Sequence, residues 1–140
     1  MNVDSIQNGI VIDHIAAGNA MKLYRLLGLD GLDVPVAMIT NVVSGKLGRK
    51  DIIKIDADIP VDINVIGYVD PGATVNIIRN GKLMEKKRIE MPEKLVNVLF
   101  CKNPRCITSC EQELDHVFVL TDRAKREYRC MYCETKASNL

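Results

Sequence analysis

Two pairs of cysteines near the C-terminus limit what this chain can fold into more than any other feature. Four residues separate Cys101 from Cys106, and two separate Cys130 from Cys133. Each pair on a tight turn can supply two adjacent corners of a tetrahedral site, which suits zinc with bonds of roughly 2.3 Å to soft ligands. Because four thiolates leave no position for water or substrate, we predict one structural Zn2+ per chain and no catalytic residue.

The same cysteines allow two other interpretations, free buried thiols or a redox dithiol formed by Cys130 and Cys133. A redox dithiol does not need the second pair, so the spacing favours a metal, with iron as an alternative to zinc. All five cysteines lie between residues 101 and 133, and this odd, clustered set is unlike the disulfide framework of a secreted domain. We expect Cys110 to be a spare thiol and His116 to be packed or hydrogen-bonded.

The length and composition of the chain allow two small domains, and its net charge does not indicate a particular binding partner. The 140 residues are 47% hydrophobic and carry a net charge of +1, so attraction to nucleic acid or anionic lipid would need a local patch. Asp4 and Asp13 interrupt the stretch in which a secretory signal would need unbroken apolar residues, and no run approaches the ~20 apolar residues of a membrane span. We therefore expect a soluble, cytoplasmic chain with no membrane partner.

The first 92 residues predict an α+β fold. The β-branched segment 9–15 indicates a strand, and a helix with Asn19 as N-cap and Gly28 as its stop follows over 20–27. Segments 34–43 and 49–56 form a hairpin around two glycines, Gly45 and Gly48, and a second hairpin joins 73–79 to 82–89 around Asn80-Gly81. With a short helix in 59–68, the order β-α-β-β-α-β plus one strand predicts a ferredoxin-like α/β sandwich with an antiparallel sheet.

The remainder predicts a small all-β zinc-binding domain. Strands are expected over 97–101, 116–122 and 128–131, and so few residues would make a marginal core without the metal. The junction lies near 91–97, where Val- and Ile-rich sequence ends and the cysteines begin. We assign 1–92 to one domain and 97–140 to the other.

Five ordered blocks carry a resemblance to a known family. The segments 101–107 and 130–134 closely resemble the zinc module of the aspartate carbamoyltransferase regulatory chain family. Upstream, the segments 9–15, 44–55 and 73–76, and then 92–93 with 97–99, match that family in the same order. The resemblance covers nearly the whole chain and implies a non-catalytic, cytoplasmic chain of pyrimidine biosynthesis. The first domain would bind nucleotide effectors and pair with the same domain of a second copy to form a regulatory dimer. The zinc domain would contact the separate catalytic chain.

The resemblance also implies the site residues. CTP and UTP would inhibit and ATP would activate from a nucleotide site made of Val3, Asp4, Asp13, His14, Lys50, Lys54, Asn76, Ile78 and Lys86. The surface docking on the catalytic chain would include Asn103, Arg105, Tyr132 and Glu134. Other family members can carry a bulkier side chain where this chain has Gly81, which predicts looser contacts to the nucleotide there.

The residues by themselves support part of this site. Two-residue alternation along the strand places Lys50 and Lys54 on one face, with ammonium groups about 13 Å apart at ~3.3 Å per residue, so the pair could bracket a polyphosphate. Lys86 could complete the cluster. The lysines alone favour a solvated strand face, and only the resemblance favours the binding site. Adjacent Asp13 and His14 should point to opposite faces unless a bulge intervenes. The glycines at 45–50 lack P-loop spacing and lie between strands, which excludes a P-loop.

Two other functional classes are disfavoured. A zinc-ribbon nucleic-acid module would use Arg123, Lys125, Arg126 and Arg129, but the chain is near neutral, only 4% aromatic, and has no interleaved stacking residues. An enzyme would need a nucleophile with its base, a carboxylate pair or an open metal site, and none of these patterns is present in the sequence.

Overall fold

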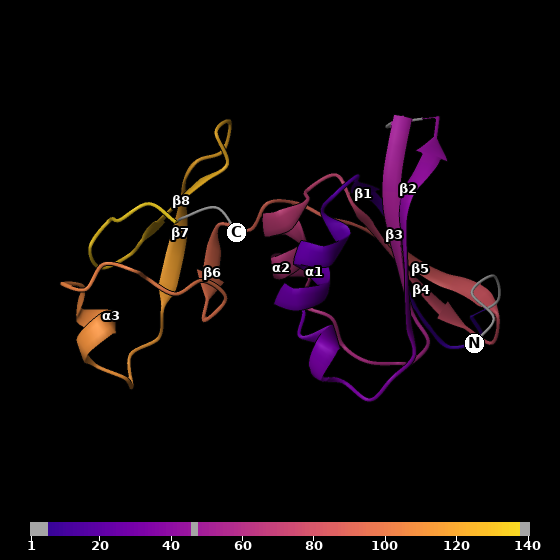
Figure 1. The fold of residues 1–140 in the computed structure, drawn as a ribbon, viewed down its shortest axis with the longest axis horizontal. Coiled ribbons are helices and arrows are strands. Elements are labelled where there is room, and N and C mark those ends of the chain that lie inside the picture. Colours follow the sequence, from indigo (N-terminus) through magenta and orange to yellow (C-terminus); the bar gives the residue numbers. More distant parts are fainter. Residues whose placement is uncertain (1–5, 46–47, 138–140) are drawn as a thin grey trace. The chain divides into compact units, whose positions relative to one another are not determined.

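The computed structural model describes residues 6–45 and 48–137, and Figure 1 shows their fold. The chain divides into two compact units, Met1–Glu90 and Met91–Leu140, each of which is described by itself. Across the described residues, no helix is long and apolar enough to cross a membrane.

The first unit is built on a five-stranded antiparallel sheet with the order β2-β3-β1-β4-β5. Its elements are β1 (Gly9–Ala16), α1 (Ala20–Leu26), the 3-10 helix η1 (Leu29–Gly31), β2 (Val36–Ser44), β3 (Gly48–Ile55), α2 (Ile63–Val69), β4 (Thr74–Arg79) and β5 (Lys82–Arg88). Four of these strands have the order of a ferredoxin-like sandwich, and β5 extends the sheet beside β4. The predicted α+β fold is confirmed.

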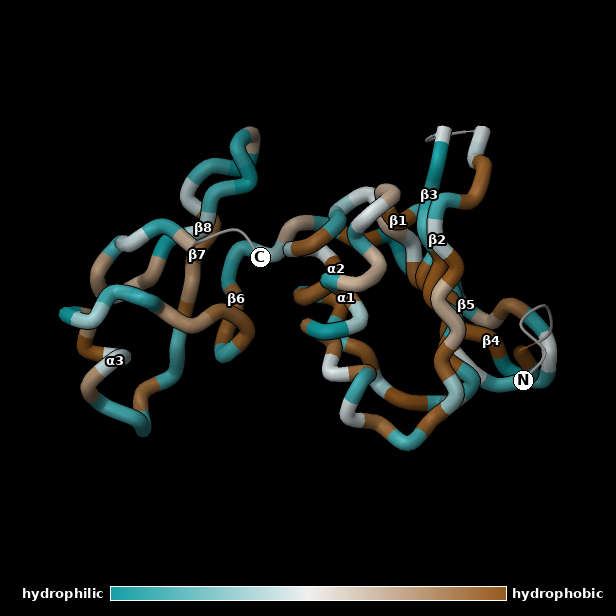
Figure 2. The backbone as a smooth tube through the Cα atoms, in the orientation of Figure 1, coloured by the Kyte–Doolittle hydropathy of each residue, from teal (hydrophilic) through white to brown (hydrophobic). Residues whose placement is uncertain are grey.

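The two faces of this sheet have different roles. Alternate residues such as Ile12, Ile53 and Val75 are buried against Leu23 of α1 and Ile66 of α2. Figure 1 shows both helices on one side of the sheet. Figure 2 shows that the helices and the strands both contain hydrophobic segments. The core therefore uses one face, and the residues between the core positions line a face without a helix.

The hairpin predictions agree with the structure where it is described. Asn80 and Gly81 have φ values of 53° and 73°, the left-handed pair that a two-residue hairpin turn requires. Gly48 also has a positive φ of 76°, whereas Gly45 is not among the positive-φ glycines. Lys46 and Leu47, between those two glycines, lie outside the described residues.

The helix predictions need two corrections. Asn19 stands at the N-cap of α1, but its backbone is helical and its side chain makes no capping bond. The carboxylate of Asp51 takes that role, because its Oδ2 accepts from the backbone N–H groups of Gly18 at 2.9 Å and Ala20 at 3.3 Å. Helix α2 begins later than predicted because Asp62 caps it, accepting from the Asn64 N–H at 2.9 Å.

The second unit holds a three-stranded antiparallel sheet with the order β6-β7-β8. Its elements are β6 (Lys94–Val96), the four-residue helix α3 (Ile107–Cys110), β7 (Val117–Asp122) and β8 (Glu127–Cys130). A small core contains Leu95, Phe118 and Tyr128. The Tyr128 hydroxyl donates to the Pro92 carbonyl at 2.5 Å, which anchors the start of the unit to β8. Its sheet agrees with the predicted small all-β domain.

The predicted strand over 97–101 is wrong. The strand lies earlier, at β6, which ends at Val96, and the next residue, Asn97, turns the chain with a φ of 57°. The Asn97 side chain holds this turn, donating to Asp115 Oδ1 at 3.0 Å and accepting from the His116 N–H at 2.9 Å. Local hydrogen bonding by an asparagine has overridden the β propensity of the residues that follow it.

Candidate functional site

The four predicted cysteines form a compact sulfur cluster in the second unit. The Sγ atoms of Cys101, Cys106, Cys130 and Cys133 lie within 4.8 Å of one another. Two of the separations, Cys101 to Cys133 and Cys106 to Cys130, are 3.6 Å and 3.7 Å. A tetrahedral metal with bonds of roughly 2.3 Å to sulfur requires sulfur separations of about 3.8 Å. The cluster therefore fits a four-thiolate metal site with no vacant corner.

Local turns explain how the chain gathers these sulfurs. Cys106 ends a turn in which its N–H donates to the Asn103 carbonyl at 3.0 Å, and it stands at the N-cap of α3. Cys130 is the last residue of β8, and the Glu134 N–H closes the next turn onto its carbonyl at 2.9 Å. Cys106, and the pair Cys130 and Cys133, are thus held by short, internally bonded turns.

Hydroxyl groups and burial act on the thiols in opposite directions. The hydroxyl and backbone of Thr135 lower the pKa of the Cys133 thiol to about 6, and its Oγ1 lies 3.1 Å from the sulfur. Burial raises the pKa of the Cys101 thiol to about 12. A coordinated divalent metal would hold all four sulfurs as thiolates, so the different pKa values of the free thiols would no longer set their protonation.

The remaining cysteine and the nearby histidine lie outside the cluster. Cys110 is exposed at the end of α3. His116 Nδ1 accepts from the Cys101 N–H at 3.3 Å, and the ring meets Phe100 edge-on with centroids 4.9 Å apart. His116 is therefore a hydrogen-bonded neighbour of the cluster, as its place in an apolar segment suggested.

The predicted docking residues flank the two cysteine turns. Asn103 donates to Thr135 Oγ1 at 3.3 Å and accepts from the Arg105 N–H at 3.0 Å, so it links the two turns. Arg105 and Tyr132 are exposed, and Glu134 has a φ of 63° just after the last cysteine. The cysteine cluster thus adjoins the backbone that carries these four side chains.

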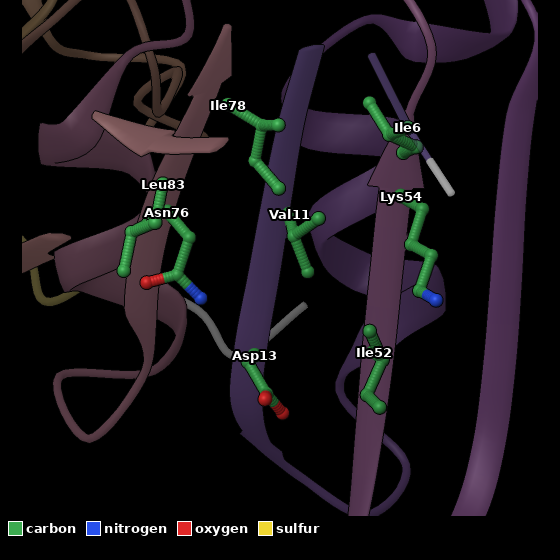
Figure 3. Close-up of a pocket in the computed structure, with 8 residues that line it drawn as sticks. All are labelled: Ile6, Val11, Asp13, Ile52, Lys54, Asn76, Ile78 and Leu83. Atoms are coloured by element: carbon green, nitrogen blue, oxygen red, sulfur yellow. The ribbon is translucent and has the colours of Figure 1, made fainter. Parts of the chain in front are cut away.

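In the first unit, a pocket of about 380 Å³ lies on the face of the sheet away from the helices. Figure 3 shows Val11 at its centre, with Asn76 on one side, Lys54 on the other and Asp13 further along the strand. The pairing register explains this, because Val11 lies opposite Lys54 of β3 and opposite Asn76 of β4. The pocket is lined by Ile6, Val11, Asp13, Ile52, Lys54, Asn76, Ile78 and Leu83.

Other predicted nucleotide residues lie beside this pocket. Lys50 Nζ is 3.0 Å from Asp13 Oδ1, and Lys86 of β5 lies directly opposite Asn76. His14 does not line the pocket. A bulge in β1 between Ile12 and Ile15 gives His14 a φ of 57°, and its Nδ1 lies 3.1 Å from Thr74 Oγ1. Val3 and Asp4 lie outside the described residues.

Sequence reasoning overlooked the apolar wall of the pocket. Val11 and Ile52 lie two residues from Asp13 and Lys54, so strand alternation could have placed them on the same face. Leu83 is also accessible to this reasoning, because it faces Ile78 across the second hairpin. Ile6 precedes the first strand, and no periodicity in the sequence locates it.

Two polar side chains of the pocket, Asp13 and Asn76, are set up to interact with a ligand. Burial alone would raise the pKa of Asp13, but the hydrogen bonds from Lys50 and from the His14 N–H outweigh it and hold that pKa below its ordinary value. Asn76 Oδ1 is buried without a hydrogen-bond partner among the described residues. The pocket therefore offers a carboxylate, ammonium groups and an unused amide oxygen above an apolar floor.

Comparison with known proteins identifies both units. Residues 1–90 match the family described as aspartate carbamoyltransferase regulatory chain, allosteric domain, and residues 93–139 match its metal binding domain. The chain is 48% identical over 134 residues to an aspartate carbamoyltransferase regulatory chain of Clostridium botulinum, covering 96% of this chain and 92% of the relative. The regulatory chain of Clostridium tetani is 49% identical over 135 residues, covering 96% and 94%.

A more distant relative matches over almost its whole length. The aspartate carbamoyltransferase regulatory chain of Bifidobacterium longum is 44% identical over 137 residues, covering 98% of this chain and 99% of the relative. The chain therefore belongs to the aspartate carbamoyltransferase regulatory chains, the allosteric and non-catalytic subunits of that enzyme.

Proposed function

We propose that the pocket of the first unit binds nucleotide effectors and that the metal unit passes their effect to an aspartate carbamoyltransferase catalytic chain. CTP and UTP would inhibit, ATP would activate, and the chain would act in the cytoplasm in pyrimidine biosynthesis. The observation that carries the proposal is the row formed by Lys54, Val11, Asn76 and Lys86 on neighbouring strands of the helix-free face. This row combines cations, an amide and an apolar floor within one surface.

The chemistry of the row suits a nucleoside triphosphate. Val11 and Ile78 offer apolar contact to a flat base, and the unused Asn76 Oδ1 can accept a hydrogen bond from the ligand. Lys54 and Lys86 are the two ends of the row, and Lys50 lies beside Asp13. The ammonium groups of these lysines can bind phosphate oxygens as charge-assisted donors. A phosphate that recruits Lys50 would have to compete with Asp13 for it.

We propose that the metal is zinc and that its role is structural. Four cysteine sulfurs at the observed separations match the ligand set of a closed zinc site. When bound, the ion supplies cross-linking of the two cysteine turns and no reactive position. Free thiols at such a site also suit the reducing cytoplasm.

Docking on the catalytic chain would use the surface around the cluster. Large apolar side chains next to the cysteines are exposed, among them Phe100 at 61%, Ile107 at 50% and Tyr132 at 42%. Exposed aromatic side chains such as Phe100 and Tyr132 suit an interface, because interface cores are enriched in aromatic residues. Asn103, Arg105 and Glu134 would provide the polar contacts around them.

Dimerisation of the regulatory chain would use the first unit. Strand β2 is at the edge of the sheet, so one side of its backbone has no partner strand within the described residues. Val43 on this strand is 72% exposed, so this part of the edge strand is accessible. A second copy of the chain can therefore extend the sheet or cover this edge.

The coupling needs little energy. A nucleotide that binds the two states of the assembled enzyme unequally shifts the equilibrium between them, and about 1 to 3 kcal/mol is enough for a regulatory effect.

The test mixes the metal-loaded chain with a cognate aspartate carbamoyltransferase catalytic trimer, and measures assembly and nucleotide-dependent activity. Lys54→Ala should weaken nucleotide binding while sparing assembly. Lys22→Ala on α1, which covers the other face of the sheet, is the matched control and should change neither. The proposal is wrong if the wild-type chain neither assembles nor changes the activity of the trimer.

A further inference from the structure

A cavity of about 250 Å³ lies in the metal unit beside the cysteine cluster. Phe100, Phe118 and Ala137 are its apolar lining residues, and Lys102 and Lys136 are its basic ones. Cys101, Asn103 and Thr135 also contribute, so the cavity adjoins the cysteine turns directly. It combines an aromatic interior with a cationic rim.

The aromatic part of the cavity is pre-formed. Phe118 is 3% exposed in the centre of the three-stranded sheet, while Phe100 is 61% exposed. The ring of Phe100 rests edge-on against His116, whose Nδ1 is in turn bonded to the Cys101 N–H at 3.3 Å. An exposed aromatic ring held in this way loses little conformational entropy when a partner binds, which favours its use as an anchor.

The rim has an excess of positive charge. Lys136 Nζ lies 3.6 Å from Glu127 Oε1, but Arg129 shares the same carboxylate at 3.2 Å. Lys102 is exposed and has no ion pair among the described residues. No acidic side chain lines the cavity within the described part of the chain. One carboxylate is thus shared by two cations, and a third cation stands nearby.

We infer that this cavity receives a segment of the catalytic chain in which a large apolar side chain lies next to a carboxylate. The apolar side chain would pack between Phe100 and Phe118, and the carboxylate would meet Lys102 and Lys136. This inference rests on the proposed docking of the metal unit, and it specifies the chemistry of the partner surface. The cavity also explains why docking would need metal, since Cys101 is both a cluster residue and part of the cavity wall.

The experiment measures the dissociation constant of the full-length, metal-loaded chain for the cognate catalytic trimer, at low and at high salt. Phe100→Ala should weaken binding about tenfold or more, as loss of an interface anchor does. Lys102→Glu should weaken it about tenfold at low salt and less at high salt, as expected of a rim charge. The matched controls are Val96→Ala and Lys125→Glu, exposed residues of the same unit that do not line the cavity.

Each outcome bears on a different claim. Metal content equal to wild type shows that a variant has kept its fold. If the wild type assembles and the Phe100 and Lys102 variants bind as tightly as their controls, the inference is overturned while the proposed docking stands. If the variants alter self-association of the chain but not assembly with the trimer, the cavity belongs to a second copy and the inference is again overturned. If the wild type does not assemble, the proposed docking itself fails.

Discussion

The two units place their functional residues differently with respect to their cores. In the first unit, isoleucine and valine side chains fill one face of a five-stranded sheet, and the pocket lies on the other face. In the second unit, Cys106 and Cys130 are themselves buried core residues beside Phe118 and Tyr128. The pocket can therefore be altered without unfolding its unit, whereas the metal site and the fold of the second unit are one feature.

The largest expected effect comes from removing the metal. A chelator should unfold the second unit, because metal binding in such sites contributes apparent folding free energy on the order of 10 kcal/mol. The first unit should keep its fold, since its core contains no cysteine. Hydrogen exchange resolved along the chain would report protection lost only in β6, β7 and β8.

Cysteine variants sharpen this prediction. Cys106→Ser should lower metal affinity and destabilise the second unit, and Cys110→Ser should leave both unchanged because Cys110 lies outside the cluster. Equal exchange in the metal-free and metal-loaded chains would show that the small core is sufficient and that the contrast between the units is false.

The next largest effect should be confined to the first unit. Ile53→Ala removes a fully buried side chain from the centre of the sheet and should lower the free energy of unfolding by about 2 to 5 kcal/mol. The metal content and the exchange protection of the second unit should not change. Denaturant unfolding followed separately in the two units measures this, and a parallel loss in both would mean that they fold as one.

A smaller loss is expected at Asp51, which braces the loop before α1. Besides Gly18 and Ala20, its carboxylate accepts from the Asn41 N–H at 2.9 Å, and the residue is 1% exposed. Asp51→Ala would leave these donors without a partner, which costs about 1 to 3 kcal/mol. Asp51→Asn keeps an acceptor and should cost less in the same unfolding measurement. Equal stability of both variants would rule out the bracing role.

The smallest effect depends on pH. The folded-state pKa of Asp13 is lowered, so the unfolded chain binds more protons and the contribution of Asp13 is present near neutral pH. It should be lost as the pH falls from about 5 through that pKa, and partial exposure limits it to about 1 kcal/mol or less. Asp13→Asn should flatten this part of the pH profile of the first unit. A profile identical to wild type would contradict the ion pair with Lys50.

Regular patterns made much of the fold predictable. Two-residue alternation, the Asn80-Gly81 turn and the order of elements all agree with the first unit. The strand at 97–101 failed because Asn97 ends β6 through its own side-chain bonds, which periodicity does not detect. The predicted cap of α1 was wrong for a related reason, since the capping residue, Asp51, comes from strand β3 and is distant in sequence.

The sites were predictable to different depths. Cysteine spacing located the whole sulfur cluster, because the two members of each pair are only a few residues apart. The pocket is assembled from three strands and depends on the bulge at His14 and on the segment that carries Ile6. The set of residues that line the pocket therefore depends on the pairing register between distant strands and on irregular backbone, and the sequence pattern indicates only part of that set.

Effector binding and docking are expected to reside in separate units. Calorimetric titration of CTP into the metal-loaded and metal-free chain, with assembly onto the catalytic trimer measured on the same samples, tests it most directly. We expect the CTP dissociation constant to change by less than about threefold, under about 1 kcal/mol, while assembly is lost without metal. Loss of CTP binding together with assembly, or assembly that persists without metal, would contradict it.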